Sequence, residues 1–376
     1  MADLSSHTMT DLQIKWWRTA LGDPELQHVT AAITQEHLAM GPVTAHFEKE
    51  LANLLGVPFV IATTSASVAL FMALLSLGIG PDDEVIVPNR TFIATAHAAL
   101  MVGAKVVLID VREDIPNLDC DQLLAKMSPR TKAIIAVHRN GRSVEMNRLV
   151  KIASANNISV IEDAAQALFS RNSSGYLGTF GDIGCFSFGV TKLITTGFGG
   201  MIATKDEKIA VRLRRIRNHG ISRDNDHYDM LGCNFKFSDI LASLGVSQLV
   251  QLSERLEHLR RIYRLYLEGL DELDWIRPIP VDVASGEIPL WTEVVVDERA
   301  PFLSYLHEQG IETRPFHPNL NVSPHIGDSN PSQFPRSDRF AAQGLILPCG
   351  PTQPLSHVET VIQIIRQYEK KRNSKH

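Results

Sequence analysis

The stretch "ISVIEDAAQALFS", residues 158–170, passes from a run of apolar residues directly into two acidic ones. Val160 and Ile161 are typical of a buried strand, because branched apolar side chains pack well on a pleated surface. Glu162 and Asp163 then stand where the strand ends. Sheets of parallel strands bind ligands at the carboxyl ends of their strands. The stretch therefore predicts a buried strand with a carboxylate at the edge of a pocket.

Strands and helices alternate outward from this stretch. The helix expected at 46–56 has Phe47, Leu51, Leu54 and Leu55 on one face and ends at Gly56, a residue that tolerates left-handed backbone angles. Strands are expected at 58–65, 83–88, 105–111, 132–138 and 158–165, with helices at 67–78, 91–103, 120–127 and 145–157. Short, continuous apolar strands between helices favour a mostly parallel sheet that is covered on both faces.

The pattern changes after residue 180. Two further strands are expected at 184–189 and 199–205, then a helix at 206–220 and one long helix from Ser238 to about Leu273. The proline-containing segment 275–296 is typical of a smaller mixed domain. We therefore predict a large α/β domain over residues 1–250, including an N-terminal helical segment, and a small C-terminal α+β domain over residues 251–376.

Composition excludes several classes of protein. The chain has 376 residues, is 44% hydrophobic and carries a formal net charge of -5, so it can bury a large core and is no typical nucleic-acid binder. The longest apolar run, residues 68–80, is too short to span a membrane. The N-terminus lacks a secretory pattern, and the four cysteines have no metal-ligand spacing. We expect a cytoplasmic protein without a metal, and we interpret the basic tail "EKKRNSKH" as a solvated end.

Asp163 and Lys192 form the most informative pair. Lys192 follows Asp163 by 29 positions, in "CFSFGVTKLITTGFGG". An unpaired buried carboxylate costs several kcal/mol, so Asp163 needs a cationic partner, and a protonated pyridine nitrogen would serve. A lysine amine forms a Schiff base with the aldehyde of pyridoxal phosphate, whose ring then accepts electrons from the substrate. The pair therefore points to pyridoxal phosphate as the cofactor.

A phosphate site is expected where the strand at 58–65 turns into the next helix. Ser65, Ala66 and Ser67 lie there, and the first N–H groups of a helix attract anions. Capping of the helix by Ser65 or Ser67 is the alternative. Ser187 offers another hydroxyl, or simply fills a strand, and Phe92 either stacks on a cofactor ring or packs in the core.

A series of segments in order, among them "VIEDAAQA", "TKLITTGFGGM", "GCNFKFSDILASLGVSQL" and "GIETRPFHP", resembles the DegT/DnrJ/StrS family of sugar aminotransferases over about residues 12 to 368. The resemblance implies the fold of type I pyridoxal phosphate enzymes. In that fold a large domain with a mostly parallel seven-stranded sheet between helices carries a smaller C-terminal α+β domain. It also implies amination of a keto sugar, usually nucleotide-linked, with an amino acid such as glutamate as donor.

The resemblance also implies roles for individual residues. Lys192 matches the catalytic lysine, Asp163 the partner of the pyridine nitrogen, and Gln166 the residue beside the phenolic oxygen of the cofactor. The remaining cofactor positions are Ala66 and Ser67 at the phosphate, Phe92 stacked on the ring and Ser187 at the phosphate. Asn234 matches an asparagine that reaches the cofactor of a neighbouring subunit, which requires a homodimer with shared active sites. Capping of a turn before Ser238 is the alternative for Asn234.

The substrate positions depart from the family pattern. Gly189, Phe198, Arg139, Asn140 and Glu145 replace residues that are usual in the family. Phe198 either reshapes the sugar pocket or packs in the core. The resemblance further marks Phe198, His219, Arg314 and His317 as substrate candidates, with a structural salt bridge as the alternative for Arg314.

Three other functions compete with an aminotransferase. A dehydratase of the same family usually has histidine in place of the lysine, so Lys192 argues against it. A nucleotide-sugar dehydrogenase or epimerase needs an early G-x-G-x-x-G turn, which this sequence lacks. A non-catalytic regulatory relative is disfavoured because both Lys192 and Asp163 are present. The expected product is an amino sugar for a cell-surface polysaccharide or a secondary metabolite.

Overall fold

Strand β5 (Ser159–Asp163) lies in the middle of a seven-stranded sheet with the order β1-β9-β8-β5-β4-β2-β3. The computed structural model describes residues 13–222, 227–326 and 333–373. The other strands of this sheet are β1 (Phe59–Thr63), β2 (Glu84–Pro88), β3 (Lys105–Ile109), β4 (Thr131–Val137), β8 (Ile183–Ser187) and β9 (Gly200–Thr204). In this sheet β9 runs in the direction opposite to the other six strands, so the predicted mostly parallel sheet is confirmed.

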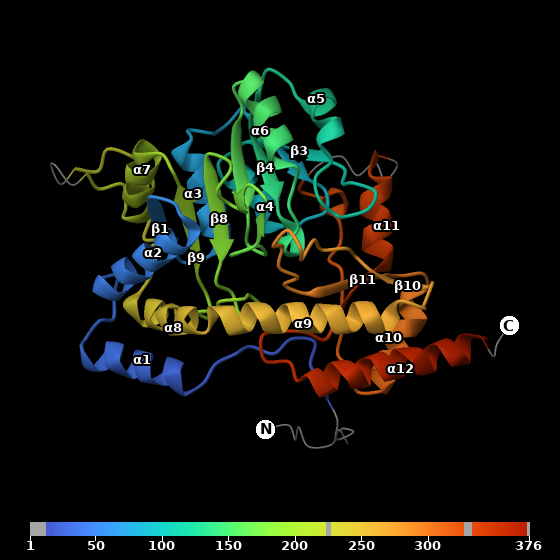
Figure 1. Ribbon diagram of the computed structural model, residues 1–376. Coiled ribbons are helices and arrows are strands. Elements are labelled where there is room, and N and C mark those ends of the chain that lie inside the picture. The colour runs from blue at the N-terminus through green and yellow to red at the C-terminus, as the bar shows by residue number, and fades with distance from the viewer. Residues whose placement is uncertain (1–12, 223–226, 327–332, 374–376) are drawn as a thin grey trace, which may run out of the picture.

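Helices cover both faces of this sheet (Figure 1). One face packs against α3 (Ala66–Ser76), α4 (Ala94–Met101) and α7 (Glu207–Arg217). The other packs against α2 (Pro42–Leu55), α5 (Leu123–Lys126) and α6 (Met146–Ala155). Alternate residues of one strand serve opposite faces: Ile134 packs toward α6, whereas Ile135 packs toward α3 and α4. The continuous apolar strands of the sequence follow from this burial on both faces.

The helix that leads into β1 ends as the sequence predicts. Helix α2 buries Phe47, Leu51 and Leu55 and stops at Gly56, which has a φ of 66°. Leu54, predicted on the same face, is instead 39% exposed. A residue with a Cβ is strained at this angle, so glycine fixes the end of the helix. Helix α1 (Asp23–Thr34) packs on α8 (Asp239–Val250) rather than on the sheet (Figure 1).

The single long helix expected from Ser238 is divided in two. Helix α8 (Asp239–Val250) and helix α9 (Leu252–Leu270) meet at Gln251, whose backbone leaves the helical range with φ -98° and ψ 12°. The two helices follow one another in nearly the same direction in Figure 1, so one side-chain pattern runs through both. The prediction of one helix was therefore wrong at a single residue that no breaker marks in the sequence.

The C-terminal part contains a second, antiparallel sheet of four strands with the order β10-β11-β13-β12. Its strands are β10 (Ile276–Pro278), β11 (Thr292–Val296), β12 (Arg314–Pro315) and β13 (Gly344–Leu347), and its helices are α10 (Arg299–Glu308), α11 (Pro335–Gln343) and α12 (Leu355–Asn373). A two-stranded hairpin, β6 (Arg171–Asn172) and β7 (Gly175–Tyr176), precedes β8.

The N-terminal segment lies against this small sheet. The N–H of Ile14 donates to the carbonyl of Gly310, and the N–H of Arg18 donates to the carbonyl of Cys349. The division at residue 250 stays a prediction. In the described ranges, no helix is long and apolar enough to cross a membrane. The expected absence of a secretory signal rests mostly on N-terminal residues that are not among those the structure describes. The end of the basic tail, residues 374–376, also lies outside the described residues.

Candidate active site

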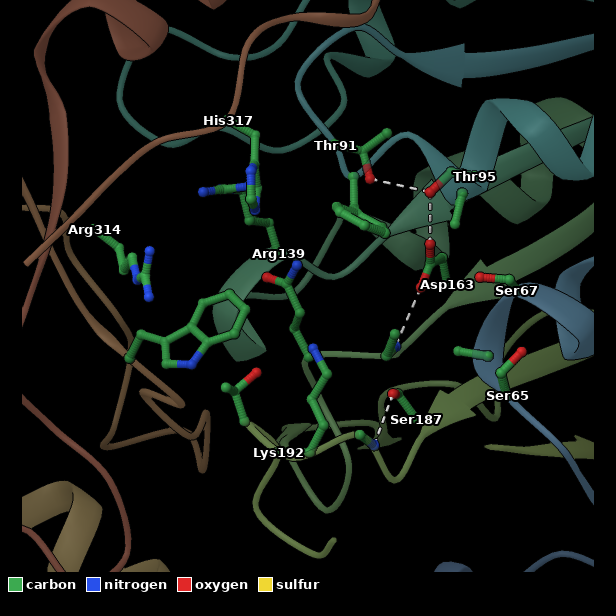
Figure 2. Close-up of a pocket in the computed structure, with 18 of the residues that line it drawn as sticks. Ser65, Ser67, Thr91, Thr95, Arg139, Asp163, Ser187, Lys192, Arg314 and His317 are labelled. Carbon is green, nitrogen blue, oxygen red and sulfur yellow. Dashed lines mark hydrogen bonds between the residues drawn. The ribbon is translucent and has the colours of Figure 1, made fainter. Parts of the chain in front are cut away.

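A pocket of about 550 Å³ opens at the carboxyl ends of β5 and β8, between the large sheet and the small one. Figure 2 shows its walls. The large sheet and its helices contribute Ser65, Ala66, Ser67, Thr91, Phe92, Thr95, Arg139, Asp163, Gln166, Ser187, Lys192 and Phe198, and residues outside that sheet contribute Trp16, Trp291, Arg314, Phe316 and His317. The fold thus brings residues that are far apart in the sequence around one space.

The two acidic residues at the end of β5 have different surroundings. Glu162 is fully buried and accepts hydrogen bonds from the N–H groups of Gly178, Phe180 and Gly181. It also accepts one from Nε2 of His138 over 2.7 Å; because Nδ1 of this ring accepts from the N–H of Val144, the proton lies on Nε2. Glu162 therefore holds the loop that enters β8, and it does not line the pocket.

Asp163 lies on the pocket side. Its Oδ2 accepts from the Thr95 hydroxyl over 2.7 Å and its Oδ1 from the N–H of Ala165 over 3.1 Å. Burial raises the pKa of Asp163 above its ordinary 3.8, although these two hydrogen bonds and the charge of Lys192 oppose the shift. In the described parts of the chain no ion pair with Asp163 forms. The carboxylate thus suits a cationic group inside the pocket.

Lys192 follows β8 and enters the same pocket, with its Nζ 4.9 Å from the centroid of the Trp291 ring. Burial lowers the pKa of Lys192 to about 8; Asp163 opposes the shift and the charge of Arg139 adds to it. A lysine amine attacks a carbonyl only in its neutral form. The lowered pKa makes that form accessible close to neutral pH.

A cradle for an anion lies at the start of α3. Ser65 caps the helix by accepting from the N–H of Val68 over 3.2 Å, so the capping alternative is confirmed for Ser65. Ala66 and Ser67 form the first turn, whose N–H groups have no acceptor within the helix. Gly200 of β9 lies directly beneath: a Cβ there would be 2.4 Å from the carbonyl carbon of Ser65. This contact fixes the cradle and leaves no space for another side chain.

Ser187 is the last residue of β8 and lines the pocket, where its hydroxyl accepts from the N–H of Gly189 over 3.2 Å. Phe92 is 49% exposed and faces the His317 ring edge-on with centroids 5.4 Å apart, so packing of Phe92 in the core was wrong. The side-chain oxygen Oε1 of Gln166 accepts a hydrogen bond of 2.8 Å from the N–H of Asn140. Asp163, Lys192, the α3 cradle and these flanking groups together fit the ring, aldehyde and phosphate of pyridoxal phosphate.

Substrate candidates occupy the outer part of the pocket. Phe198 is 76% exposed, which excludes core packing, and its ring lines the opening. The guanidinium carbon of Arg314 lies 5.3 Å from the centroid of the Trp16 ring. Arg314 forms no ion pair within the described ranges, so the alternative of a structural salt bridge was wrong. Partial desolvation and the charges of Arg139 and Arg90 lower the pKa of His317.

Two predicted residues do not line this pocket. Asn234 is exposed and its backbone pairs with Asn218, while Ser238, not Asn234, caps α8. His219 is exposed in the turn after α7, with a φ of 59°, and its N–H donates to the carbonyl of Cys233. Within one chain, the structure therefore does not bring Asn234 or His219 to the groups around Lys192.

Sequence reasoning missed three residues at the centre of the site. Thr95 holds Asp163, and the only available signal was its spacing of four from Thr91, whose hydroxyl lies 3.1 Å from that of Thr95. Trp291 packs against Lys192 from a segment almost 100 residues away, which no local pattern reveals. Arg139 was noted as a departure from the family pattern, but nothing in the sequence placed it in the pocket.

A mostly parallel sheet with a lysine, a buried aspartate and a phosphate cradle at its carboxyl edge defines a pyridoxal phosphate enzyme of fold type I. The model of the DegT/DnrJ/EryC1/StrS aminotransferase family matches residues 20–366, and the chain belongs to this family. The protein is thus a pyridoxal phosphate-dependent sugar aminotransferase, as the sequence predicts.

Individual relatives agree with this assignment. GDP-perosamine synthase of Caulobacter vibrioides is 33% identical over 337 residues, 88% of this chain and 91% of the relative. The dTDP-3-amino-3,4,6-trideoxy-alpha-D-glucose transaminase of Streptomyces venezuelae is 33% identical over 335 residues, 88% of each chain. The crystal structure of the aminotransferase TlmJ from Streptoalloteichus hindustanus superimposes with a TM-score of 0.90 at 30% identity, covering 94% of this chain and 98% of that one. The name of a further relative, EpsN of Bacillus subtilis, includes dependence on pyridoxal phosphate.

Proposed function

We propose that the protein transfers the amino group of an amino acid, glutamate being the expected donor, to a nucleotide-linked keto-deoxy sugar. In the overall reaction, the amino acid becomes a 2-oxo acid and the sugar carbonyl becomes a carbon that carries a hydrogen and an amine, so no external oxidant or reductant is needed. The names of the two curated relatives, which refer to a GDP-linked and a dTDP-linked product, support a nucleotide-linked acceptor.

The single observation that carries the proposal is the division of the pocket into two parts. The inner part contains Lys192 and Asp163, which suit amine chemistry. The outer part contains Arg314, the exposed ring of Phe198 and the partly buried ring of Trp16. A guanidinium binds phosphate oxygens well, and aromatic faces accept bases and sugars, so this outer part suits a nucleotide diphosphate.

The residues of the inner part divide the work between them. Bound pyridoxal phosphate would supply an aldehyde and a ring that accepts electrons. Asp163 would keep the ring nitrogen protonated, since a neighbouring carboxylate favours the charged form. Lys192 would bind the aldehyde, then take the proton from the donor carbon that loses the amine and later deliver one to the sugar carbon that gains it. Trp291 packs against the lysine and limits the access of water.

A panel of nucleotide-linked keto sugars tests this proposal. The purified protein with pyridoxal phosphate and glutamate is incubated with each sugar, and the products are read by mass. We expect a mass change equal to replacement of one carbonyl oxygen by an amine and a hydrogen, with 2-oxoglutarate formed in equal amount. A sugar that loses water without gaining nitrogen would instead identify a dehydratase.

We also propose that the enzyme is a homodimer in which Asn234 reaches the phosphate of the partner's cofactor. Asn234 is exposed and lies outside its own pocket, as such a role requires. In mixed dimers of Lys192→Ala and Asn234→Ala chains, one site carries both lesions and the other carries neither. Activity should therefore return when the two weak parents are mixed. No recovery despite demonstrated subunit exchange would remove the shared site.

The cysteine side chains bear on where in the cell the protein is expected to work. All four cysteines are free, and Cys120, Cys185 and Cys349 are buried. This supports the expected reducing environment of the cytoplasm.

A further inference from the structure

Three arginines surround one buried carboxylate behind the pocket wall. Nη2 of Arg139 lies 2.8 Å from Oε1 of Glu293, and Nη1 of Arg142 lies 2.5 Å from Oε2. Arg142 also donates to the carbonyls of Pro280 and Ile279. Arg90 is the third arginine, and its charge acts on Glu293 as well. All four side chains are at most 3% exposed, so the cluster holds more positive than negative charge away from water.

The excess charge falls on Arg90 and Arg139. Arg90 donates through Nη1 to the side chain of Asn319 over 3.0 Å and to the carbonyl of His317, but its Nε and Nη2 have no acceptor. Nε of Arg139 also has none. As far as the chain is described, Arg90 forms no ion pair and Arg139 forms one only with Glu293. Because three buried guanidinium groups share one carboxylate, the cluster would favour a further anion where a guanidinium borders an open space.

The cluster reaches the pocket through Arg139, since Arg90 is not among the residues that line it. The guanidinium carbons of Arg139 and Arg90 lie 4.4 Å and 5.2 Å from the centroid of Phe316, a ring that lines the pocket. Arg139 lines the pocket itself, beside His317 and on the same space as Lys192 (Figure 2). An anion bound there would lie near the amine of Lys192 and away from the phosphate cradle at the start of α3.

We infer that Arg139, supported by Arg90, forms a carboxylate subsite for the substrate carbon on which Lys192 acts. The inference rests on the proposed function, because it assigns a group of the substrates. A planar guanidinium matches the two oxygens of a carboxylate. In an α-amino acid the carboxylate is one bond away from the carbon that loses its amine, which fits a subsite close to Lys192. An acid group on the acceptor sugar is the second possible source of the same chemistry.

The two half-reactions separate these sources. The donor half-reaction is followed by the absorbance change of the bound cofactor after glutamate is added. The acceptor half-reaction is followed after the amine-loaded enzyme is mixed with the keto sugar. Arg139→Gln should lower the rate constant per unit glutamate by about 10- to 100-fold, the usual cost of losing one charged hydrogen-bonded contact. Loss in the acceptor half-reaction alone would assign the carboxylate to the sugar, and loss in neither would overturn the subsite.

Two further variants make the test specific. Arg139→Lys keeps the charge but loses the two parallel N–H donors of the guanidinium, and it should recover part of the loss. Arg299→Gln is the matched control: Arg299 is a half-buried arginine near Arg90 that donates to the carbonyls of Ala341 and Gly344 outside the pocket. It should change the donor half-reaction by less than about twofold, as a substitution remote from the site does.

A binding measurement gives a readout without turnover. In the wild-type protein, 2-oxoglutarate should raise the unfolding temperature with a saturating dependence on concentration, because a ligand that binds only the folded state stabilises it. Arg139→Gln should weaken this dependence by the same factor as the donor half-reaction, whereas Arg299→Gln should keep it. Equal stabilisation of wild type and Arg139→Gln would overturn the subsite. Failure of the sugar panel with an intact glutamate half-reaction would disprove the proposed acceptor but not the subsite.

Discussion

Replacement of Asp163 by asparagine removes one negative charge from the pocket and leaves the shape of the side chain nearly unchanged. The amide oxygen of the asparagine can still accept a hydrogen bond from the N–H of Ala165, and its amide nitrogen can donate one to the Thr95 hydroxyl. Thr95 lies 3.1 Å from the hydroxyl of Thr91, to which it can then donate. Every hydrogen bond of Asp163 thus has a substitute, so we expect Asp163→Asn to fold.

The expected loss is catalytic. Without the carboxylate, no group in the described pocket keeps a ring nitrogen protonated, and the ring accepts electrons less well. Removing a preorganised group that stabilises developing charge costs about 10²- to 10³-fold in kcat, or ~2.7–4 kcal/mol. We expect a loss of this size in Asp163→Asn, measured as 2-oxoglutarate formed from glutamate and keto sugar.

Stability should change in the opposite sense. Burial raises the pKa of Asp163 above 3.8, so the folded cofactor-free protein holds this proton at a pH where the unfolded chain has released it. Its free energy of unfolding therefore falls as the pH rises from about 4 through the raised pKa. Asp163→Asn lacks this penalty, and near neutral pH the cofactor-free variant should be at least as stable as wild type in urea.

Glu162→Gln is the matched control, since Glu162 is the adjacent carboxylate with a structural role. An amide at this position cannot accept from three N–H groups and His138 at once. Leaving a buried donor unpaired costs about 1–3 kcal/mol, so this variant should be the less stable of the two. Turnover of Asp163→Asn within about fivefold of wild type, or a greater loss of stability than in Glu162→Gln, would refute the reasoning.

Three further predictions follow from the site. The pKa of Lys192 is about 8, and only the neutral amine reacts. The rate of cofactor attachment to the cofactor-free protein, followed by stopped-flow absorbance, should therefore rise about tenfold per pH unit below pH 8 and level off above it. A rate that does not change with pH would contradict this prediction. Gly200→Ala should displace the start of α3, lower stability by about 1–3 kcal/mol and weaken binding of pyridoxal phosphate in an equilibrium titration. Gly80→Ala is the control and should change neither, because its added Cβ would meet only the carbonyl oxygen of Val102, at 3.8 Å. Phe198→Ala should leave the unfolding temperature unchanged and alter KM for the sugar but not for glutamate, because the ring is 76% exposed at the opening.

The sequence predicts the fold well where local chemistry decides the outcome. Helix α2 ends at Gly56 because of one backbone angle, and the successive residues Val160 and Ile161 of β5 are both apolar because both faces of the sheet are covered. The pairing of Asp163 with Lys192 in one pocket follows from the rule that parallel strands present their carboxyl ends at one edge. Each of these features depends on a few neighbouring residues or on a general property of parallel sheets.

Features that depend on distant contacts were not predictable. Trp291 reaches Lys192, and Arg139 shares Glu293 with Arg142, only because the small sheet folds back on the large one. The break between α8 and α9 at Gln251 has no glycine or proline to mark it. In each case the position is set by packing between segments that the linear sequence does not relate.

Lys192 is proposed to bind the cofactor and to move the proton. Reduction of the loaded protein with borohydride, followed by digestion and mass mapping of the peptides, tests this role directly. We expect one permanently modified lysine, Lys192, and no modification in Lys192→Ala. The reduced adduct on any other lysine, or undiminished trapping in Lys192→Ala, would contradict it.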